Sequence, residues 1–464
     1  MRTYDLIVIG SGPAGKTCAI QAAKLGKRVA IIEGFRKLGG VCVHTGTIPS
    51  KTLRETVLNL TGWRERGFYG RAYRVKSDIK AEDLTERLTK TLQNEVDILE
   101  DQLTRNNVEF IQGWATFISP SEIEVCDPRD ERHVLKADKF MVAVGTRTYR
   151  PDDVPFNGRT IVDSDEITAL ASLPRSITVI GAGVIGVEFA SILNVLDINV
   201  TLIEPRESML DFMDHEILMH FRHEIVDKGV RLQFGHKVQS IEEREDGRCI
   251  VTLDTKRTIA SEMVLFAAGR VGMTDNLGLE KVGLEADHRG RLKVNDNFQT
   301  AVPNIYAAGD VIGFPSLAST SIEQGRVACL HAFDEPVTNS HRFFPYGIYA
   351  VPEMSTVGMN EAEVCERDIP YEVGLALLRE TSRGKVMGLQ SGVMKMIFST
   401  KTRRLLGVHI MGEGATELIH IGQAVITLKG TLDYFLENAF NYPTLAEAYK
   451  VAALDANNRI LAAR

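Results

Sequence analysis

The chain has 464 residues, of which 44% are hydrophobic and 25% are charged, and its formal net charge is -7. This composition is typical of water-soluble globular proteins, and the length predicts about three domains of ~150 residues each. The negative charge and the lack of a basic run argue against a nucleic-acid partner. The sequence shows no apolar stretch of the ~20 residues that a membrane span needs and no signal peptide, so we expect a cytoplasmic protein without a membrane partner.

Six cysteines are scattered along the sequence without a CxxC pair and without the spacing of metal ligands. This distribution suits a reducing cytosol and predicts neither a disulfide framework nor a metal site. The six are Cys18, Cys42, Cys126, Cys249, Cys329 and Cys365.

Residues 4–33 carry the pattern of a nucleotide-binding unit. An apolar run leads into a glycine-rich turn, a helix is predicted to about residue 25, and a second apolar run ends at Glu33. The glycines permit a tight turn and a close approach of the backbone to a pyrophosphate, while the helix N-terminus offers unpaired N–H groups. A carboxylate at the position of Glu33 can accept hydrogen bonds from a ribose. The predicted ligand-binding residues of this unit are Gly10, Gly12, Pro13, Ala14, Gly15 and Glu33.

A second copy of the same pattern spans residues 177–204. A single glycine-rich turn is weak evidence for a nucleotide site, but two copies with the same spacing from first glycine to carboxylate are strong evidence for two dinucleotide sites. The predicted ligand-binding residues of the second copy are Gly181, Gly183, Val184, Ile185, Gly186 and Glu204.

Residues 79–105 show the apolar spacing of a long amphipathic helix. Buried strands are predicted at 141–146 and 263–270, each closing one nucleotide unit, and the Pro/Asp-rich stretch 150–155 is predicted to link domains. A further apolar strand ends in Asp310, whose carboxylate suits either a polyol ligand or a helix cap.

From about residue 343 the pattern changes to strands followed by helices, without a nucleotide fingerprint. This composition predicts an α+β module suited to packing against another subunit. The fold class expected for the whole chain is α/β, with two Rossmann-like dinucleotide-binding domains and a C-terminal α+β dimerisation domain.

The stretch from Gly39 to Lys51 places Cys42 five residues before Thr47. A threonine hydroxyl cannot form a disulfide or carry electrons, so this spacing offers one redox sulfur where a dithiol relay needs two. Taken alone, the stretch predicts a small-residue turn that enters a helix, with Pro49 in the first helical turn.

Taken in order, the two glycine units, the Gly40 to Lys51 stretch and the strand Tyr306–Asp310 resemble the flavin-dependent disulfide reductases of the lipoamide dehydrogenase type. The resemblance covers essentially the whole chain. It implies that residues 1–150 and 275–337 form an FAD-binding domain, that 151–274 bind a nicotinamide nucleotide, and that 338–464 form the dimer interface.

The resemblance also implies site residues. Lys51 would lie near flavin N5 and pair with Glu188, Asp310 would contact the ribityl chain, and Glu33 would hold the adenosine ribose. A lysine near N5 stabilises negative charge on a reduced flavin. Further contacts to the cofactor or nucleotide are expected from Gly40, Val41, Cys42, Ala115, Gly145, Thr146, Leu317, Ala318, Gly269 and Arg270.

Two departures from the disulfide reductases point away from thiol chemistry. Thr47 replaces their second cysteine, and the run from Asn441 through Tyr442 to Glu447 replaces their His-Pro-Thr-x-x-Glu motif. A tyrosine with a pKa of ~10 is a poor base compared with a histidine near ~6.5. In both features the sequence is similar to the soluble pyridine nucleotide transhydrogenases, which keep the flavin and nicotinamide sites without the dithiol.

This similarity implies an enzyme in which hydride passes from NADPH by way of flavin N5 to NAD+ with ping-pong kinetics. Its expected catalytic residues are Lys51, Glu188, Thr47 and Cys42. One site must then accept both a ribose 2′-hydroxyl and a 2′-phosphate, and we hypothesise that Glu204 and Arg206 together provide this dual specificity.

Two alternative functions stay open at this stage, as does the role of Cys42. The protein is an NAD(P)H oxidase or quinone reductase if its turnover of oxygen or quinone exceeds nucleotide exchange. It is a non-catalytic, flavin-loaded subunit of a larger assembly if NADPH fails to bleach its bound FAD. Cys42 is either an inert residue packed by the flavin or a thiol that forms a sulfenic acid. The expected assembly is a homodimer or a larger homo-oligomer.

Overall fold

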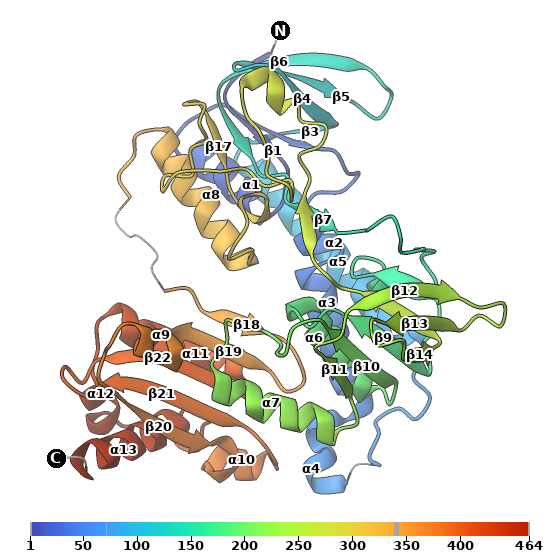
Figure 1. Ribbon diagram of the computed structural model, residues 1–464. Coiled ribbons are helices and arrows are strands. Elements are labelled where there is room, and N and C mark those ends of the chain that lie inside the picture. Colours follow the sequence, from blue (N-terminus) through green and yellow to red (C-terminus); the bar gives the residue numbers. More distant parts are fainter. Residues whose placement is uncertain (1, 71, 338–342, 463–464) are drawn as a thin grey trace.

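The computed structural model describes residues 2–70, 72–337 and 343–462. Three layered units follow one another around a central group of helices, with the two chain ends far apart (Figure 1). The first unit contains a seven-stranded sheet in the order β3-β2-β1-β6-β5-β4, and β17 pairs with β6. Its strands are β1 (Arg2–Ile9), β2 (Val29–Glu33), β3 (Glu109–Gln112), β4 (Trp114–Ser119), β5 (Glu122–Cys126), β6 (Arg132–Val142) and β17 (Ile305–Ala307).

The parallel pairing of β1 with β2 and β6 confirms the predicted first nucleotide unit. β17 joins the same sheet beside β6 from far along the sequence. Helix α8 packs against α1 so closely that a Cβ at Gly325 would lie 2.2 Å from the carbonyl oxygen of Ala14. The helices of this unit are α1 (Pro13–Lys24), α2 (Gly40–His44), α3 (Thr47–Thr61), α4 (Arg66–Tyr69), α5 (Ala81–Arg105) and α8 (Ala318–Ala332).

The long amphipathic helix predicted over 79–105 is α5, and its apolar stripe is buried. Pro49 lies in the first turn of α3, as predicted for the stretch that follows Cys42. Single turns of 3₁₀ helix are η1 (Trp63–Glu65), η2 (Ile167–Ala169), η3 (Leu279–Val282), η4 (Asp310–Ile312) and η5 (Leu378–Glu380).

The second unit repeats the first at smaller scale. Its parallel sheet has the order β11-β10-β9-β15-β8, and a three-stranded antiparallel sheet, β12-β13-β14, lies beside it. An antiparallel ribbon of β7 and β16 connects the first two units. The elements are β7 (Thr146–Thr148), β8 (Ile161–Asp163), β9 (Ser176–Ile180), α6 (Val184–Val195), β10 (Asn199–Glu204), α7 (His215–Asp227), β11 (Arg231–Phe234), β12 (Val238–Glu243), β13 (Cys249–Leu253), β14 (Thr258–Ser261), β15 (Met263–Phe266) and β16 (Arg270–Gly272).

The third unit is the predicted α+β module. Its five-stranded sheet has the order β18-β19-β22-β21-β20 and is antiparallel in every pair. Its elements are β18 (Tyr346–Ile348), β19 (Met354–Gly358), α9 (Glu361–Glu366), β20 (Tyr371–Leu377), α10 (Ser382–Val386), β21 (Val393–Ser399), β22 (Leu405–Met411), α11 (Ala415–Thr427), α12 (Leu432–Glu437) and α13 (Glu447–Ala462).

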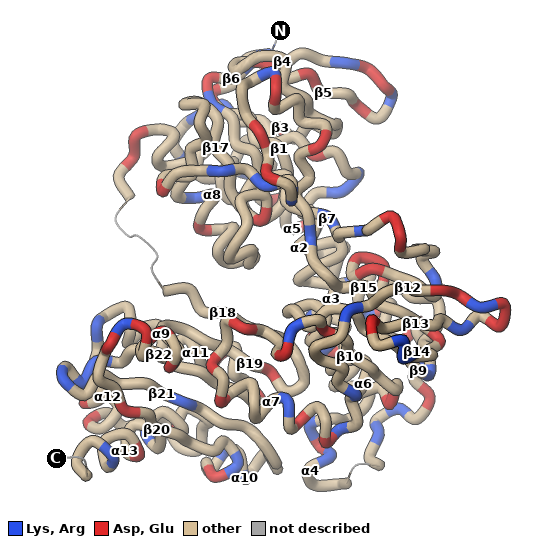
Figure 2. Tube along the Cα trace, viewed as in Figure 1, with Lys and Arg blue, Asp and Glu red and all other residues tan. Residues whose placement is uncertain are grey.

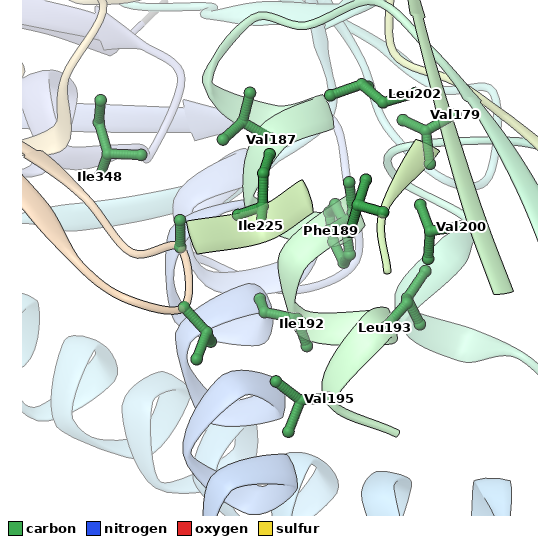
Figure 3. Packing of buried hydrophobic residues seen from close by; sticks show 14 of the residues in the cluster. Val179, Val187, Phe189, Ile192, Leu193, Val195, Val200, Leu202, Ile225 and Ile348 are labelled. Atoms are coloured by element: carbon green, nitrogen blue, oxygen red, sulfur yellow. The ribbon is translucent and has the colours of Figure 1, made fainter. Parts of the chain in front are cut away.

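A hydrophobic core joins α3, the second unit and the third unit. Leu53 of α3 and Ile348 of β18 belong to the same buried cluster as the α6 side chains Val187 and Ile192. Figure 3 shows Ile348, Val187 and Phe189 among the labelled members of this cluster. The core therefore fixes the start of α3 against α6, which bear the predicted catalytic residues Lys51 and Glu188.

The exact domain limits remain a prediction. The seven-stranded sheet takes strands from both predicted FAD-binding segments, 1–150 and 275–337, and the β7–β16 ribbon crosses from the first segment to 151–274. The limit at residue 338 lies outside the described residues. Basic and acidic residues are interspersed over all three units (Figure 2).

Candidate active site

A cavity of about 1620 Å³ lies between the three units and is lined by residues from each of them. Both glycine-rich turns face it, as do Lys51, Glu188 and Asp310. Every predicted site residue lines this cavity except Gly15 and Gly186. The structure therefore brings together residues that the sequence separates by more than 250 positions.

Gly15 and Gly186 have a packing role at equivalent positions of the two turns. A Cβ on Gly15 would lie 1.9 Å from the carbonyl oxygen of Gly10, and one on Gly186 would lie 1.8 Å from that of Gly181. By contrast, no atom lies within 4 Å of a Cβ at Gly12 or Gly183, and both of these glycines face the cavity. In each turn, the third glycine lets the helix approach the strand and the second leaves room for a ligand.

The two strand-ending carboxylates are held in the same way. Glu33 accepts hydrogen bonds from the backbone N–H groups of Ser11 (3.0 Å) and Phe35 (3.0 Å) and from the Ser11 hydroxyl (2.6 Å). Glu204 accepts from the backbone N–H of Ala182 at 2.7 Å and from Nε of Arg206 at 2.8 Å. Burial raises the pKa of Glu204, but these bonds outweigh it and leave the pKa lowered. Ser11 was not predicted, although its position inside the turn is a usable signal.

Lys51 and Glu188 form an ion pair where the three units meet. The Lys51 ammonium lies 2.7 Å from Oε2 of Glu188, whose side chain is 4% exposed. The other oxygen of Glu188 accepts the backbone N–H of Tyr349 at 2.8 Å, and the Tyr349 ring lies 4.9 Å from the Lys51 ammonium. The predicted pairing is therefore present, and the third unit holds it in place.

Tyr346 and Tyr349 are cavity-lining residues that the sequence analysis missed. Burial raises the pKa of the Tyr346 phenol to about 12, with smaller contributions from the carboxylates of Asp310 and Glu188. Tyr346 therefore stays protonated at neutral pH, and its hydroxyl donates to the carbonyl oxygen of Pro315 at 3.1 Å. The short apolar-aromatic run around it resembles an ordinary edge strand, so only the tertiary arrangement reveals its place at the site.

Asp310 lines the cavity at the start of η4. Burial raises the pKa of its carboxyl, while Arg270, Thr146 and Ser321 oppose the shift. Arg270 is itself fixed by an ion pair with Asp165 at 2.8 Å and by hydrogen bonds to Thr146. A buried carboxyl with a raised pKa is suited to hydrogen bonding with ligand hydroxyl groups.

Cys42 and Thr47 are neighbours across the turn between α2 and α3. Burial raises the pKa of the Cys42 thiol, and hydrogen bonding to the Thr47 side chain and the charge of Lys16 only partly counteract this effect. A thiol with a raised pKa is a weak nucleophile at neutral pH. The pair therefore has neither a second sulfur nor the environment of a reactive thiolate.

The first-unit half of the cavity fits a large planar cofactor with a pyrophosphate. The hydroxyl of Thr45 is buried, lines the cavity and has no hydrogen-bond partner in the described part of the chain. Such an orphaned donor is costly unless a ligand satisfies it. At the other end Trp114 packs over Gly34 and edge-on to Phe35, with ring centroids 5.3 Å apart, beside the buried carboxylate of Glu33.

Tyr442 lies apart from this cavity. Its side chain is 71% exposed, in the segment between α12 and α13. Glu447 stabilises that segment by accepting the backbone N–H of Thr444 at 3.1 Å. The motif that replaces the reductase base therefore does not reach the cavity of its own chain.

The fold and the paired glycine units agree with a comparison against protein-family models. A model described as pyridine nucleotide-disulphide oxidoreductase matches residues 4–325, and the dimerisation domain of the same group matches residues 344–453. The chain belongs to the pyridine nucleotide-disulphide oxidoreductases.

Among curated proteins, the chain is similar to soluble pyridine nucleotide transhydrogenases. The protein of that name from Mycobacterium tuberculosis is 49% identical over 463 residues, which cover 100% of this chain and 99% of the relative. The one from Escherichia coli is 40% identical over 462 residues, which cover 98% of each chain.

Solved structures of the same fold include LpdA from Mycobacterium tuberculosis, with a TM-score of 0.89, 24% identity and coverage of 98% of this chain and 99% of that chain. The HOCl-induced flavoprotein disulfide reductase RclA from Escherichia coli, solved as a Cu(II) complex, has a TM-score of 0.88 at 26% identity, with the same coverage. Among the described residues, no helix combines the length and apolar character needed to cross a bilayer.

Proposed function

We propose that this chain is an FAD-dependent transhydrogenase that transfers a hydride from NADPH to NAD+ in two half-reactions at one nucleotide site. The observation that carries the proposal is the single cavity in which both glycine turns meet at the Lys51–Glu188 pair, next to a Cys42 that faces Thr47. Without a second sulfur beside Cys42, electrons cannot leave through a dithiol relay. The 49% and 40% identical relatives carry the name of this activity.

The first unit would hold FAD. The turn from Gly10 to Gly15 and the N-terminus of α1 suit its pyrophosphate, Glu33 its adenosine ribose, and Asp310 its ribityl hydroxyls. Thr45 offers a buried hydroxyl without a partner in the described chain. The remaining predicted contacts line the same half of the cavity: Gly40, Val41, Cys42, Ala115, Gly145, Thr146, Leu317 and Ala318. When bound, FAD supplies the group that alternately accepts and donates a hydride.

The protein's own contribution is orientation and charge. Lys51 is fixed by Glu188 and presents an ammonium group to the cavity, where it stabilises negative charge that develops during hydride transfer. Glu188 in turn accepts the backbone N–H of Tyr349, so the third unit helps to hold the ion pair at the cavity wall. Thr47 keeps a polar, redox-inactive group beside Cys42.

The second unit would hold the nicotinamide nucleotides in turn. Its glycine turn at residues 181–186 and α6 repeat the geometry of the first unit, and Glu204 is placed to accept a ribose 2′-hydroxyl. Arg270 and Gly269 line the junction between the two halves of the cavity.

We infer a homodimer or larger homo-oligomer in the cytoplasm. The dimerisation-domain match over residues 344–453 supports self-association. All six cysteines are free thiols, which fits a reducing compartment.

Anaerobic stopped-flow spectroscopy tests the function. The holoenzyme is reduced with NADPH and then mixed with NAD+ or its thionicotinamide analogue while flavin absorbance is followed. We expect rapid bleaching by NADPH and rapid recovery with NAD+. Recovery only after oxygen or quinone is admitted would instead identify an oxidase or quinone reductase, and a failure of NADPH to bleach the flavin would identify a non-catalytic flavoprotein.

The same experiment with Lys51→Met tests the site. We expect both half-reactions to slow by ~10²-fold, which is the usual effect of removing one group that stabilises developing charge. The control variant is Lys80→Met, because Lys80 is exposed at the start of α5 and lies outside the cavity. Equal rates in the two variants would show that Lys51 has no part in hydride transfer.

A further inference from the structure

The loop after β11 lies directly beside the turn after β10. The two strands pair in parallel with Glu204 opposite Phe234, so their carboxyl ends reach the same edge of the sheet. The backbone N–H of Gly235 donates to the carbonyl oxygen of Arg206 at 3.1 Å. This bond sets His236 and Lys237 next to Glu204 and Arg206, and all four line the cavity.

Arg206 is already engaged by two carboxylates. Its Nε lies 2.8 Å from a carboxylate oxygen of Glu204, and its Nη1 lies 2.6 Å from a carboxylate oxygen of Asp211. One guanidinium charge is therefore shared between two negative charges. A phosphate that approached this corner would meet no excess of positive charge from Arg206 alone, so the predicted Glu204–Arg206 pair needs a further cation to accept a 2′-phosphate.

Lys237 is a cavity-lining cation beside this corner. Its ammonium forms no ion pair or hydrogen bond with the described part of the chain. Its backbone is nevertheless fixed, because its N–H donates to a carboxylate oxygen of Asp254 at 3.2 Å and its carbonyl accepts the Asp254 N–H at 2.9 Å. His236 lies on the same loop, with Nδ1 3.6 Å from Asp254.

We propose that Lys237, with His236 beside it, binds the 2′-phosphate that distinguishes NADP(H) from NAD(H), while Glu204 accepts the 2′-hydroxyl of NAD(H). This inference rests on the proposed function, because it names the groups that let one site serve both nucleotides. A ribose 2′-phosphate carries close to two negative charges at neutral pH, and a flexible lysine ammonium is suited to such a compact anion. With NAD(H) bound, the Lys237 ammonium remains hydrated, so it loses little solvation free energy.

Nucleotide binding to the oxidised holoenzyme tests the assignment. Dissociation constants for NADP+ and NAD+ are measured by isothermal titration calorimetry for the wild type, Lys237→Gln and the matched control Lys256→Gln. Lys256 is a lysine of the same unit that lies outside the cavity and contacts Gln239. We expect Lys237→Gln to weaken NADP+ by ~10-fold, as for the loss of one charge-assisted hydrogen bond, and NAD+ by less than ~2-fold.

Adding His236→Gln to Lys237→Gln is expected to weaken NADP+ further and to leave NAD+ unchanged. The assignment is wrong if Lys237→Gln weakens both nucleotides equally or neither. A separate assay keeps it apart from the proposed function: hydride exchange from NADH to the thionicotinamide analogue of NAD+ involves no 2′-phosphate. If the wild type catalyses this exchange but Lys237→Gln leaves the ratio of NADP+ to NAD+ affinity unchanged, only the specificity assignment is overturned. If the wild type does not catalyse the exchange, the proposed function is overturned.

Discussion

At the scale of single residues, the decisive feature is what surrounds Cys42. Its thiol is half-buried, its neighbour across the turn is Thr47, and burial raises its pKa. A redox-active cysteine needs a lowered pKa or a partner sulfur, and neither is present in the described site. The surroundings of Cys42 therefore favour hydride transfer between nucleotides over thiol chemistry.

The raised pKa of Cys42 leads to a prediction about its reactivity. At pH 8 its thiolate fraction should be below that of a free cysteine with a pKa of ~8.5, so alkylation by iodoacetamide should be slow and should accelerate as the pH rises past 9. The exposed Cys365 of the same holoenzyme is the internal reference. Peptide mass spectrometry of timed samples measures both rates, and labelling of Cys42 as fast as Cys365 at pH 7 would indicate a stabilised thiolate.

At the scale of elements, two glycines of each glycine-rich turn have different roles, one in ligand binding and one in helix packing. The glycine before the helix faces the cavity, and the glycine one turn into the helix packs against the end of the preceding strand. The sequence pattern specifies both because they require the absence of a Cβ for different reasons. Substitution at one or the other should therefore separate binding from stability.

We predict opposite outcomes for Gly186→Ala and Gly183→Ala. The first places a Cβ 1.8 Å from the Gly181 carbonyl and must push α6 away from β9, which should cost more than ~2 kcal/mol of unfolding free energy. The second meets no protein atom within 4 Å and should leave stability unchanged while weakening nucleotide binding. Urea denaturation and NADP+ titration of both variants check this, and equal stability losses would contradict it.

At the scale of the whole molecule, buried charge ties the second and third units together. The ammonium of Lys395 on β21 is 1% exposed and lies 2.9 Å from Asp214, which caps the N-terminus of α7. Glu216 lies 3.0 Å away, and Glu361 also contacts the ammonium. In the first unit, Arg54 of α3 pairs with Glu353 at 3.1 Å and donates to the carbonyl oxygen of Ala350 at 3.1 Å, next to Tyr349.

Lys395→Met should therefore destabilise the protein strongly. It leaves the buried Asp214 carboxylate without its cation, and breaking such a pair costs about 3–5 kcal/mol. Burial raises the pKa of Asp214, but His409, Lys395 and backbone hydrogen bonds hold it below its usual value, so its contribution is present at neutral pH and is lost as the pH falls through that lowered pKa. Thermal unfolding at pH 7 and at about pH 3, which lies below the ordinary aspartate pKa of ~3.9, should show a smaller loss for the variant at the lower pH. An unchanged melting temperature at pH 7 would refute the prediction.

The local elements were accessible from sequence because their causes are local. The period of apolar residues identified α5, and the two glycine patterns identified β1–α1–β2 and β9–α6–β10 with their carboxylates Glu33 and Glu204. The replacement of a cysteine by Thr47 also required only the sequence. Resemblance to a known family supplied the pairing of Lys51 with Glu188, which no spacing rule contains.

The sequence by itself determined the fold class, the two nucleotide units and the lack of a second cysteine at position 47 beside Cys42, because each depends on residue types at short, fixed spacing. The tertiary structure decided which distant residues share the cavity. Tyr349 reaches Glu188, and Gly235 in the loop of Lys237 reaches the Arg206 carbonyl, only because segments far apart in the chain pack together. Side-chain charge balance at the Arg206 corner depends on those neighbours, so it appears only once the chain is folded.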